Sequence, residues 1–261
     1  MSDARHYFSR IRLKSETPDL MTLARLATKD HYQEHRLVWS FFPDEPEAKR
    51  DFIYRREAKA LSTEENDLAR LTYYMVSRRP PQPNSAIWEV ETRDYAPQLV
   101  VGDCLEFSLR ANPVSRSKKP RTEAGEAEYR KRREASGKAM PRDSRRRKRD
   151  DLMKMTVQHL QETFGPTWKE HYDRVELANE AGRCWLETQG QRLGFDIEDA
   201  SVASYSYDSF TPRKGETVEI GRMDFTGNLR VAQPEAFSKA LFEGIGPAKA
   251  FGCGLLLVRR F

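Results

Sequence analysis

The sequence has little cysteine and no long apolar segment. Its three cysteines, Cys104, Cys184 and Cys253, lie far apart and form no C-x-x-C pair, so we expect reduced thiols rather than a disulfide framework. No stretch approaches the ~20 consecutive apolar residues that a membrane-spanning helix requires. The first residues, MSDARHYF, also lack the apolar core of a signal peptide. These absences predict a cytoplasmic protein that does not associate with a membrane.

Positive charge is abundant, and it is concentrated in one region. The segment Pro113–Arg149 holds fifteen Lys and Arg residues against five acids, although the whole chain of 261 residues has a net charge of only +5. The remainder of the chain is therefore net negative. A basic segment on a mildly acidic body indicates a polyanionic partner that is held at one place.

The first hundred residues have the pattern of a ferredoxin-like domain, β-α-β-β-α-β. A helix is predicted from an N-cap at Asp30 to a stop before Pro43, and a short second helix is expected near the breaker-rich stretch Arg78–Pro83. Alternating or apolar runs predict the strands, which are 7–14, 52–56, 71–76 and 87–92.

The second half of the sequence repeats the same order of elements. Strands are predicted at 104–111, 201–210, 217–225 and 255–258, with helices at 152–163, 175–193 and 234–243. The fold class is therefore α+β, with two tandem ferredoxin-like (RRM-like) domains at 1–100 and 101–261. The basic insertion in the second domain, about 114–174, has too few aliphatic residues to bury, so we expect partial disorder or a charge-laced helix there.

The segment His31–His35 allows three interpretations. It matches the H-x-x-E-H pattern of inverted zinc proteases, but no segment supplies a third ligand. A histidine on a helix can also be a solvated or structurally satisfied residue. In the third interpretation, Tyr32 and His35 share one helical face at i, i+3 and provide acid–base chemistry for a phosphodiester. RNA would supply its own 2′-hydroxyl nucleophile, so neither a metal nor a small-molecule cofactor is expected.

A glycine-rich segment close to the C-terminus predicts a phosphate-binding loop. Glycines allow positive φ and bring bare N–H groups against an anion. The expected RNA-binding residues of this loop are Gly244, Gly246, Lys249, Gly252 and Gly254.

Two further features bear on how RNA would bind. Arg213 and Lys214 occupy the tip of a predicted hairpin, which is either simply solvated or placed against duplex phosphates. No strand carries the aromatic RNP1 pattern of RNA-recognition sheets. Recognition of the shape of a stem is therefore favoured over base stacking.

Four stretches together resemble a known family. They are GIGPAKAFGCGLL at 244–256, Tyr32–Arg36 with Phe42-Pro43 downstream, Arg50–Phe52, and FSLRANP at 107–113. In their order along the chain, these stretches resemble CRISPR-associated endoribonucleases of the CasE type, the subunit that processes crRNA in type I-E Cascade. The basic region is longer than in that family, so its role is not carried over.

The resemblance implies that the chain binds the hairpin of a CRISPR repeat RNA and cleaves at the base of its stem. It implies metal-independent attack by the 2′-hydroxyl, which leaves 5′-hydroxyl and 2′,3′-cyclic phosphate ends. It also implies that His35 and Tyr32 are the catalytic residues, and it leaves open which of them is the acid and which the base. It also implies that the protein stays with its crRNA and other Cascade subunits, and that Arg36, Arg213 and Lys214 contact RNA. The alternative is a non-catalytic RNA-binding subunit of a ribonucleoprotein.

Overall fold

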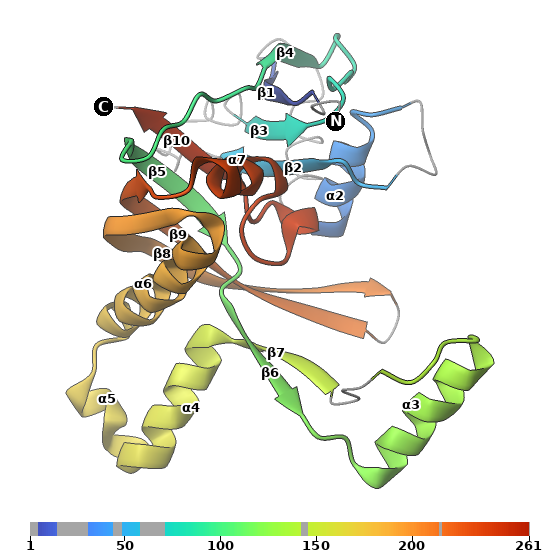
Figure 1. Cartoon of the computed structure of the whole chain (residues 1–261), viewed down its shortest axis with the longest axis vertical. Coiled ribbons are helices and arrows are strands. Elements are labelled where there is room, and N and C mark those ends of the chain that lie inside the picture. The colour runs from blue at the N-terminus through green and yellow to red at the C-terminus, as the bar shows by residue number, and fades with distance from the viewer. Residues whose placement is uncertain are drawn as a thin grey trace. The chain divides into compact units, whose positions relative to one another are not determined.

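The computed structural model describes residues 5–14, 31–43, 49–57, 71–141, 146–213 and 216–260. The chain forms two compact units. One comprises residues 1–113 and 173–261, and the other is the insertion, residues 114–172 (Figure 1). The predicted boundary between residues 100 and 101 falls inside the first unit and remains a proposal.

The first unit begins with a four-stranded antiparallel sheet. Its strands are β1 Tyr7–Leu13, β2 Phe52–Glu57, β3 Thr72–Ser77 and β4 Trp88–Asp94. They lie in the order β2-β3-β1-β4, which is the ferredoxin-like arrangement. On β1 the residues Ile11 and Leu13 are buried, while Arg10 reaches across to Glu91 on β4. The alternation seen in the sequence therefore separates a core face from a charged face.

The helix α2, His31–Trp39, packs on one face of this sheet. Val38 and Phe41 enter a core of buried aromatic residues that includes Tyr54 and Tyr73. Part of the opposite face is also covered, because Ile53 and Val76 pack against Leu255, close to the C-terminal end of the chain. The opposite face is therefore buried at β2 and β3 and charged at β1 and β4, and the two halves of the first unit share apolar surface.

The prediction of a short second helix before β4 is wrong. Residues 78–87 form an extended connection with a turn at its end. Three prolines, Pro80, Pro81 and Pro83, remove backbone donors and disfavour helical geometry at the residues before them, which explains the difference.

The second sheet repeats the topology of the first. Its strands are β5 Cys104–Ala111, β8 Phe195–Arg213, β9 Glu216–Val231 and β10 Leu256–Arg260. They lie in the order β10-β5-β9-β8, all antiparallel. The prediction of two ferredoxin-like folds is thus confirmed. β8 and β9 are both longer than predicted. In β8, register shifts such as the one between Val202 and Ser204 interrupt the alternation that would have revealed its full length.

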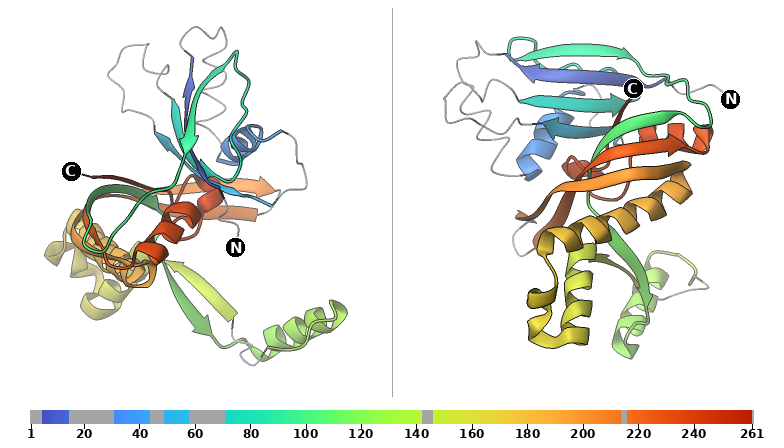
Figure 2. Two further views of the ribbon diagram at one scale, coloured as in Figure 1. Left: turned by 45° about the horizontal axis from the view of Figure 1, so that its top comes forward. Right: turned by 90° about the vertical axis from the view of Figure 1, so that its left-hand side faces the viewer.

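Two helices, of twenty and ten residues, pack beside the second sheet. α6, Arg174–Leu193, lies along β8 (Figure 2). It approaches closely at Gly182, where a Cβ atom would stand only 2.8 Å from a methyl group of Val202. α7, Pro234–Glu243, begins with proline at its first turn, as predicted, and buries Phe237. Among the helices that the structure describes, none is long and apolar enough to cross a membrane.

The insertion forms a unit of its own. Its elements are β6 Val114–Lys119, α3 Glu123–Ala135, β7 Arg146–Asp151, α4 Leu152–Phe164, η2 Gly165–Thr167 and α5 Trp168–His171. α3 is the expected charge-laced helix and has no buried residue. The strands β6 and β7, however, pair as an antiparallel ribbon, which neither expectation for this region included. Asp151 ends the ribbon by capping α4, where its side chain accepts a hydrogen bond from the backbone N–H of Lys154.

Candidate functional site

The helix α2 carries the candidate catalytic histidine. His35 lies in its second turn, three residues after Tyr32, so the structure keeps both on one helix. The side chain of Tyr32 and the predicted N-cap, Asp30, are outside the described part of the chain. Arg36 is exposed on the same helix.

The imidazole of His35 is held by a neighbour that the sequence analysis missed. The indole Nε1–H of Trp39 donates a hydrogen bond to Nε2 of His35 over 3.0 Å. Nε2 therefore accepts, and the proton of the neutral ring sits on Nδ1. The i, i+4 spacing of the two residues in a helix was the signal that could have found this contact.

His35 is neutral in this environment. Burial lowers its pKa below the ordinary value, and the positive charge of Arg50 acts in the same direction. The backbone carbonyl of Ala250 opposes these effects, although it forms no well-aligned hydrogen bond with the buried Nδ1. A neutral imidazole at pH 7 can accept a proton, which suits a general base.

The glycine loop, residues 244–254, reaches His35. The ring of Phe251 lies 6.0 Å from the imidazole, centre to centre. The phenol of Tyr54 donates to the carbonyl of Ala250 over 3.0 Å, and burial raises the pKa of this phenol well above its ordinary value. A buried, protonated tyrosine of the first sheet thus fixes a loop of the second sheet beside the histidine.

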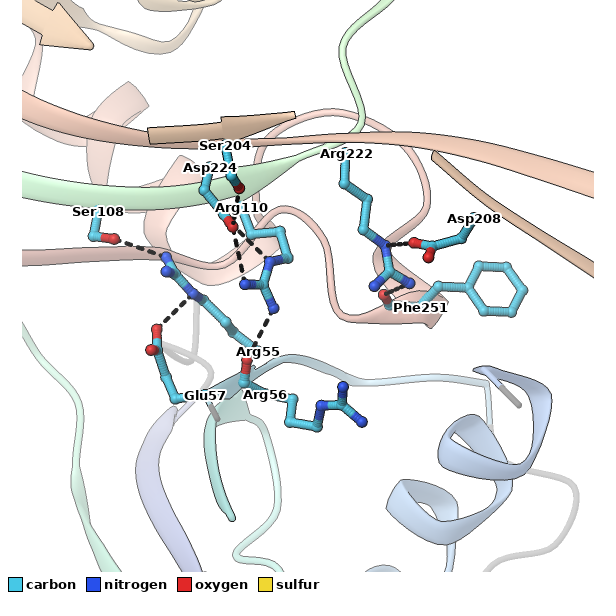
Figure 3. Close-up of polar contacts among 10 residues, drawn as sticks. All are labelled: Arg55, Arg56, Glu57, Ser108, Arg110, Ser204, Asp208, Arg222, Asp224 and Phe251. Carbon is cyan, nitrogen blue, oxygen red and sulfur yellow. Dashed lines mark hydrogen bonds and ion pairs between the residues drawn. The ribbon is translucent and has the colours of Figure 1, made fainter. Parts of the chain in front are cut away.

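A second anchor holds the same part of the loop. The guanidinium of Arg222, on β9, donates to the carbonyl of Phe251 over 3.3 Å and pairs with Asp208 over 2.9 Å (Figure 3). Residues 250–251 are therefore held from both sheets. Sequence reasoning missed these anchors, because they lie far from the loop along the chain.

The glycines of the loop have different roles. Gly244 and Gly254 are buried, have positive φ, and use their N–H groups internally, on the carbonyls of Ala240 and Arg110. A Cβ atom on Gly254 would stand 2.8 Å from the backbone oxygen of Ile245. These two N–H groups are therefore engaged within the chain, on α7 and β5, and contact of Gly244 and Gly254 with RNA stays a prediction. For Gly246, Gly252 and Lys249, contact with RNA stays a prediction.

A basic cleft adjoins this loop. It has a volume of about 960 Å³ and lies within the first unit. Its basic lining residues are Lys49, Arg50, Arg78, Lys239 and Lys249, against three acids. Because Arg50 both lines the cleft and acts on the pKa of His35, the cleft opens close to the candidate catalytic group.

A polar network joins the two sheets beneath the site (Figure 3). Arg110, on β5, binds both oxygens of Asp224 at 2.8 and 3.0 Å and also donates to the carbonyl of Arg56 on β2. Arg55, almost fully buried, donates to the hydroxyl of Ser108 over 2.9 Å. These contacts fix the orientation of β2, which carries Tyr54, relative to the second sheet.

The predicted hairpin tip, Arg213 and Lys214, lies at the edge of the described part of the chain. Arg213 is the last residue of β8, and its side chain is not among those described. Lys214 lies outside the described residues altogether. Their contact with RNA remains a prediction.

Comparison with known proteins identifies the family. A family model described as CRISPR associated protein matches residues 6–260. The chain belongs to this family. Within the CRISPR-associated family, the Cascade subunit CasE of Escherichia coli (strain K12) is 26% identical over 237 residues, covering 90% of this chain and 94% of the relative. The family suggested by the four sequence stretches is thus confirmed.

Solved structures of CRISPR-associated proteins share the fold. The endoribonuclease Cse3 bound to a 19-nucleotide RNA has a TM-score of 0.62 at 20% identity, covering 97% of this chain and 99% of that one. Cas6e from Escherichia coli K-12 has a TM-score of 0.57 at 21% identity, covering 98% and 100%. Both confirm the two ferredoxin-like folds.

Membership of the CRISPR-associated family also bears on the H-x-x-E-H motif. It replaces the zinc-protease interpretation of His31–His35. Within this motif the Glu34 carboxylate is buried, with one oxygen 3.8 Å from the Arg56 guanidinium. Among the side chains that the structure describes, no three His, Cys, Asp or Glu gather into a metal-binding cluster.

Proposed function

We propose that the chain is a metal-independent endoribonuclease that binds CRISPR repeat hairpins in pre-crRNA and cleaves at the base of the stem. It then stays bound to the crRNA as a subunit of Cascade in antiviral defence. The names of the relatives support this proposal, since they include a Cascade subunit and an endoribonuclease bound to RNA. The observation that carries it is the position of His35, neutral and held between Trp39 and the glycine loop beside a basic cleft.

In the proposed reaction, the 2′-hydroxyl attacks the adjacent phosphorus while the bond to the 5′-oxygen breaks. Neutral His35 accepts the proton of the 2′-hydroxyl, and the 5′-oxygen takes a proton from a second donor, for which we propose Tyr32. The products are a 2′,3′-cyclic phosphate and a 5′-hydroxyl. Because Nε2 accepts from Trp39 in the free protein, that hydrogen bond must give way before Nε2 can act.

RNA binding in this proposal uses positive charge rather than base stacking. Lys249 and Arg50, in the basic cleft, are placed to attract the RNA backbone toward His35. Phosphates that approach would raise the pKa of His35, and the lowering by burial acts against this rise. Arg36, Arg213 and Lys214 are proposed to contact the stem.

The test is cleavage of the cognate repeat RNA in excess EDTA, with analysis of both product ends. We expect cleavage to persist and His35→Ala to abolish it while hairpin affinity is retained. Loss of cutting under chelation would refute the metal-independent mechanism. A collapse of affinity in His35→Ala would make the histidine a structural residue.

The alternative is a non-catalytic RNA-binding subunit. One observation favours it: both imidazole nitrogens of His35 are occupied or buried in the free protein, as in a structural histidine. A 2′-deoxy substitution at the scissile nucleotide separates the two functions. It should stop cleavage by an enzyme, and a mere binder would leave both RNAs intact.

A further inference from the structure

The second unit contains an unusually basic ribbon. The strands β6 and β7 have six residues each, with the sequences VSRSKK and RRKRDD. More than half of these residues are Lys or Arg, and the two acids, Asp150 and Asp151, are both at the end that leads into α4. Positive charge is therefore polarised toward the other end of the ribbon.

The register of the ribbon places like charges opposite one another. Arg116 pairs with Arg149, Lys118 with Arg147, and Lys119 with Arg146. Like charges directly across an antiparallel pair destabilise it. A polyanion bound along the ribbon would reduce this repulsion. The pairing of β6 with β7 should therefore be more stable with a polyanion bound than without one.

The alternation of side chains along each strand divides the basic positions of the ribbon between its two faces. Positions 116, 118, 147 and 149 share one face of the ribbon, in two directly opposed pairs. The other face carries serines at 115 and 117, the acid at 150 and three more basic positions, 119, 146 and 148. The acidic end has a structural role, since Asp151 caps α4. The first face thus holds four of the seven basic positions of the ribbon.

The shape of the element indicates which polyanion it fits. The major groove of B-form DNA, about 12 Å wide, admits a two-stranded β-ribbon. The major groove of A-form RNA is too narrow and deep for such an element. We propose that the β6–β7 ribbon binds double-stranded DNA through its phosphates, as a second nucleic-acid site apart from the RNA site of the first unit. At about 3.3 Å per residue, the ribbon would cover roughly 20 Å of duplex.

The test uses the full chain and a labelled DNA duplex of about 20 base pairs, two helical turns. Binding is followed by fluorescence anisotropy at salt concentrations from about 50 to about 200 mM. In one variant, Arg116, Lys118, Arg147 and Arg149 are all changed to threonine, which keeps strand propensity. We expect affinity to fall more than about tenfold and the salt slope to drop by up to about 3.6, because each cation that meets a phosphate contributes about 0.9.

Two controls make the result specific. Changing the exposed α3 and post-α3 cations Arg130, Lys131, Arg132 and Lys138 to glutamine removes the same charge from the same unit and should leave the DNA affinity nearly unchanged. The variant with Arg116, Arg147 and Arg149 changed to lysine keeps the charge and should keep the salt slope. If the glutamine control loses as much binding, or the lysine variant as much as the threonine variant, the proposal is overturned.

The remaining outcomes are also decisive. Equal or tighter binding of an RNA duplex of the same sequence would overturn the assignment to DNA, and unchanged DNA binding in the threonine variant would point to a protein partner instead. Cleavage of repeat RNA, measured in every variant, reports separately on the proposed nuclease function. We expect it to be unaffected.

Discussion

Replacing Trp39 by phenylalanine tests whether the indole sets the protonation of His35. The change removes the N–H that donates to Nε2 of His35 but keeps an aromatic ring against Phe52, whose centre lies 5.2 Å from that of Trp39. A donor to Nε2 stabilises only the neutral imidazole. The pKa of His35 should therefore rise in Trp39→Phe.

The size of the shift follows from the energy of one hydrogen bond. This bond forms only with the neutral ring, so its loss removes about 0.5–1.5 kcal/mol that favours the neutral form and raises the pKa of His35. Burial and the charge of Arg50 remain in Trp39→Phe, and both still act to lower the pKa of His35. Arg50→Gln should move the pKa in the same direction, because it removes a nearby positive charge.

The assay is the pH dependence of single-turnover cleavage, together with an NMR titration of the His35 ring. If neutral His35 is the base, the rising limb of the pH–rate profile moves to higher pH by the same amount as the pKa. Trp168→Phe makes the same chemical change in the second unit and should leave the profile in place. If the rising limb does not move, or moves to lower pH, in Trp39→Phe, the indole does not hold His35 in its neutral form.

Three further substitutions test the supports of the site. Tyr54→Phe removes the donor to the Ala250 carbonyl, so we expect slower cleavage at unchanged hairpin affinity and a loss of about 0.5–1.5 kcal/mol in urea unfolding. Gly254→Val places a Cβ 2.8 Å from a backbone oxygen at a φ of +96°, so it should cost about 1–3 kcal/mol or more and weaken both binding and cleavage. Asp224→Asn weakens the pair with Arg110, and we expect a loss of about 1.5–3 kcal/mol at neutral pH. Burial is the largest single effect and raises the pKa of Asp224, but the hydrogen bonds and charge of Arg110, together with Ser204 and Arg55, outweigh it. The folded pKa is therefore below its ordinary value, and the loss should disappear as pH falls through the folded pKa.

Each of these results has a contradicting outcome. Wild-type cleavage in Tyr54→Phe would mean that the loop needs no anchor on the first sheet. Gly102→Val shares a positive φ but has open space around it, so a loss equal to that of Gly254→Val would assign the effect to backbone strain alone. A difference between Asp224→Asn and the wild type that persists in acid would show that Arg110 does not depend on the ionised carboxylate.

Much of the fold was predictable because local patterns carry it. The alternation of Ile11 and Leu13 with arginines marked β1, and Pro234 marked the first turn of α7. Where local pattern fails, the prediction fails with it. Register shifts hid the length of β8, and the β6–β7 ribbon has no apolar alternation at all.

The candidate site was only half visible in the sequence. His35 and the glycine loop stood out by residue type, and Trp39 was within reach by helical spacing. That Ala250 and Phe251 lie beside His35 follows only from long-range packing, through Tyr54 and Arg222, and no local signal encodes such contacts. The internal use of the Gly244 and Gly254 amides was hidden for the same reason, since it depends on which carbonyls come near in three dimensions.

The hydrogen bond from Tyr54 to Ala250 joins residues 196 positions apart, and this separation has a consequence for biosynthesis. A ribosome releases α2 and β2 long before residues 250–251, so a nascent chain carries His35 without the loop that flanks it. With synthesis at ~5–20 residues per second, this interval lasts on the order of ten seconds or more. During that time the growing polypeptide should be unable to cut RNA, including the message from which it is being translated.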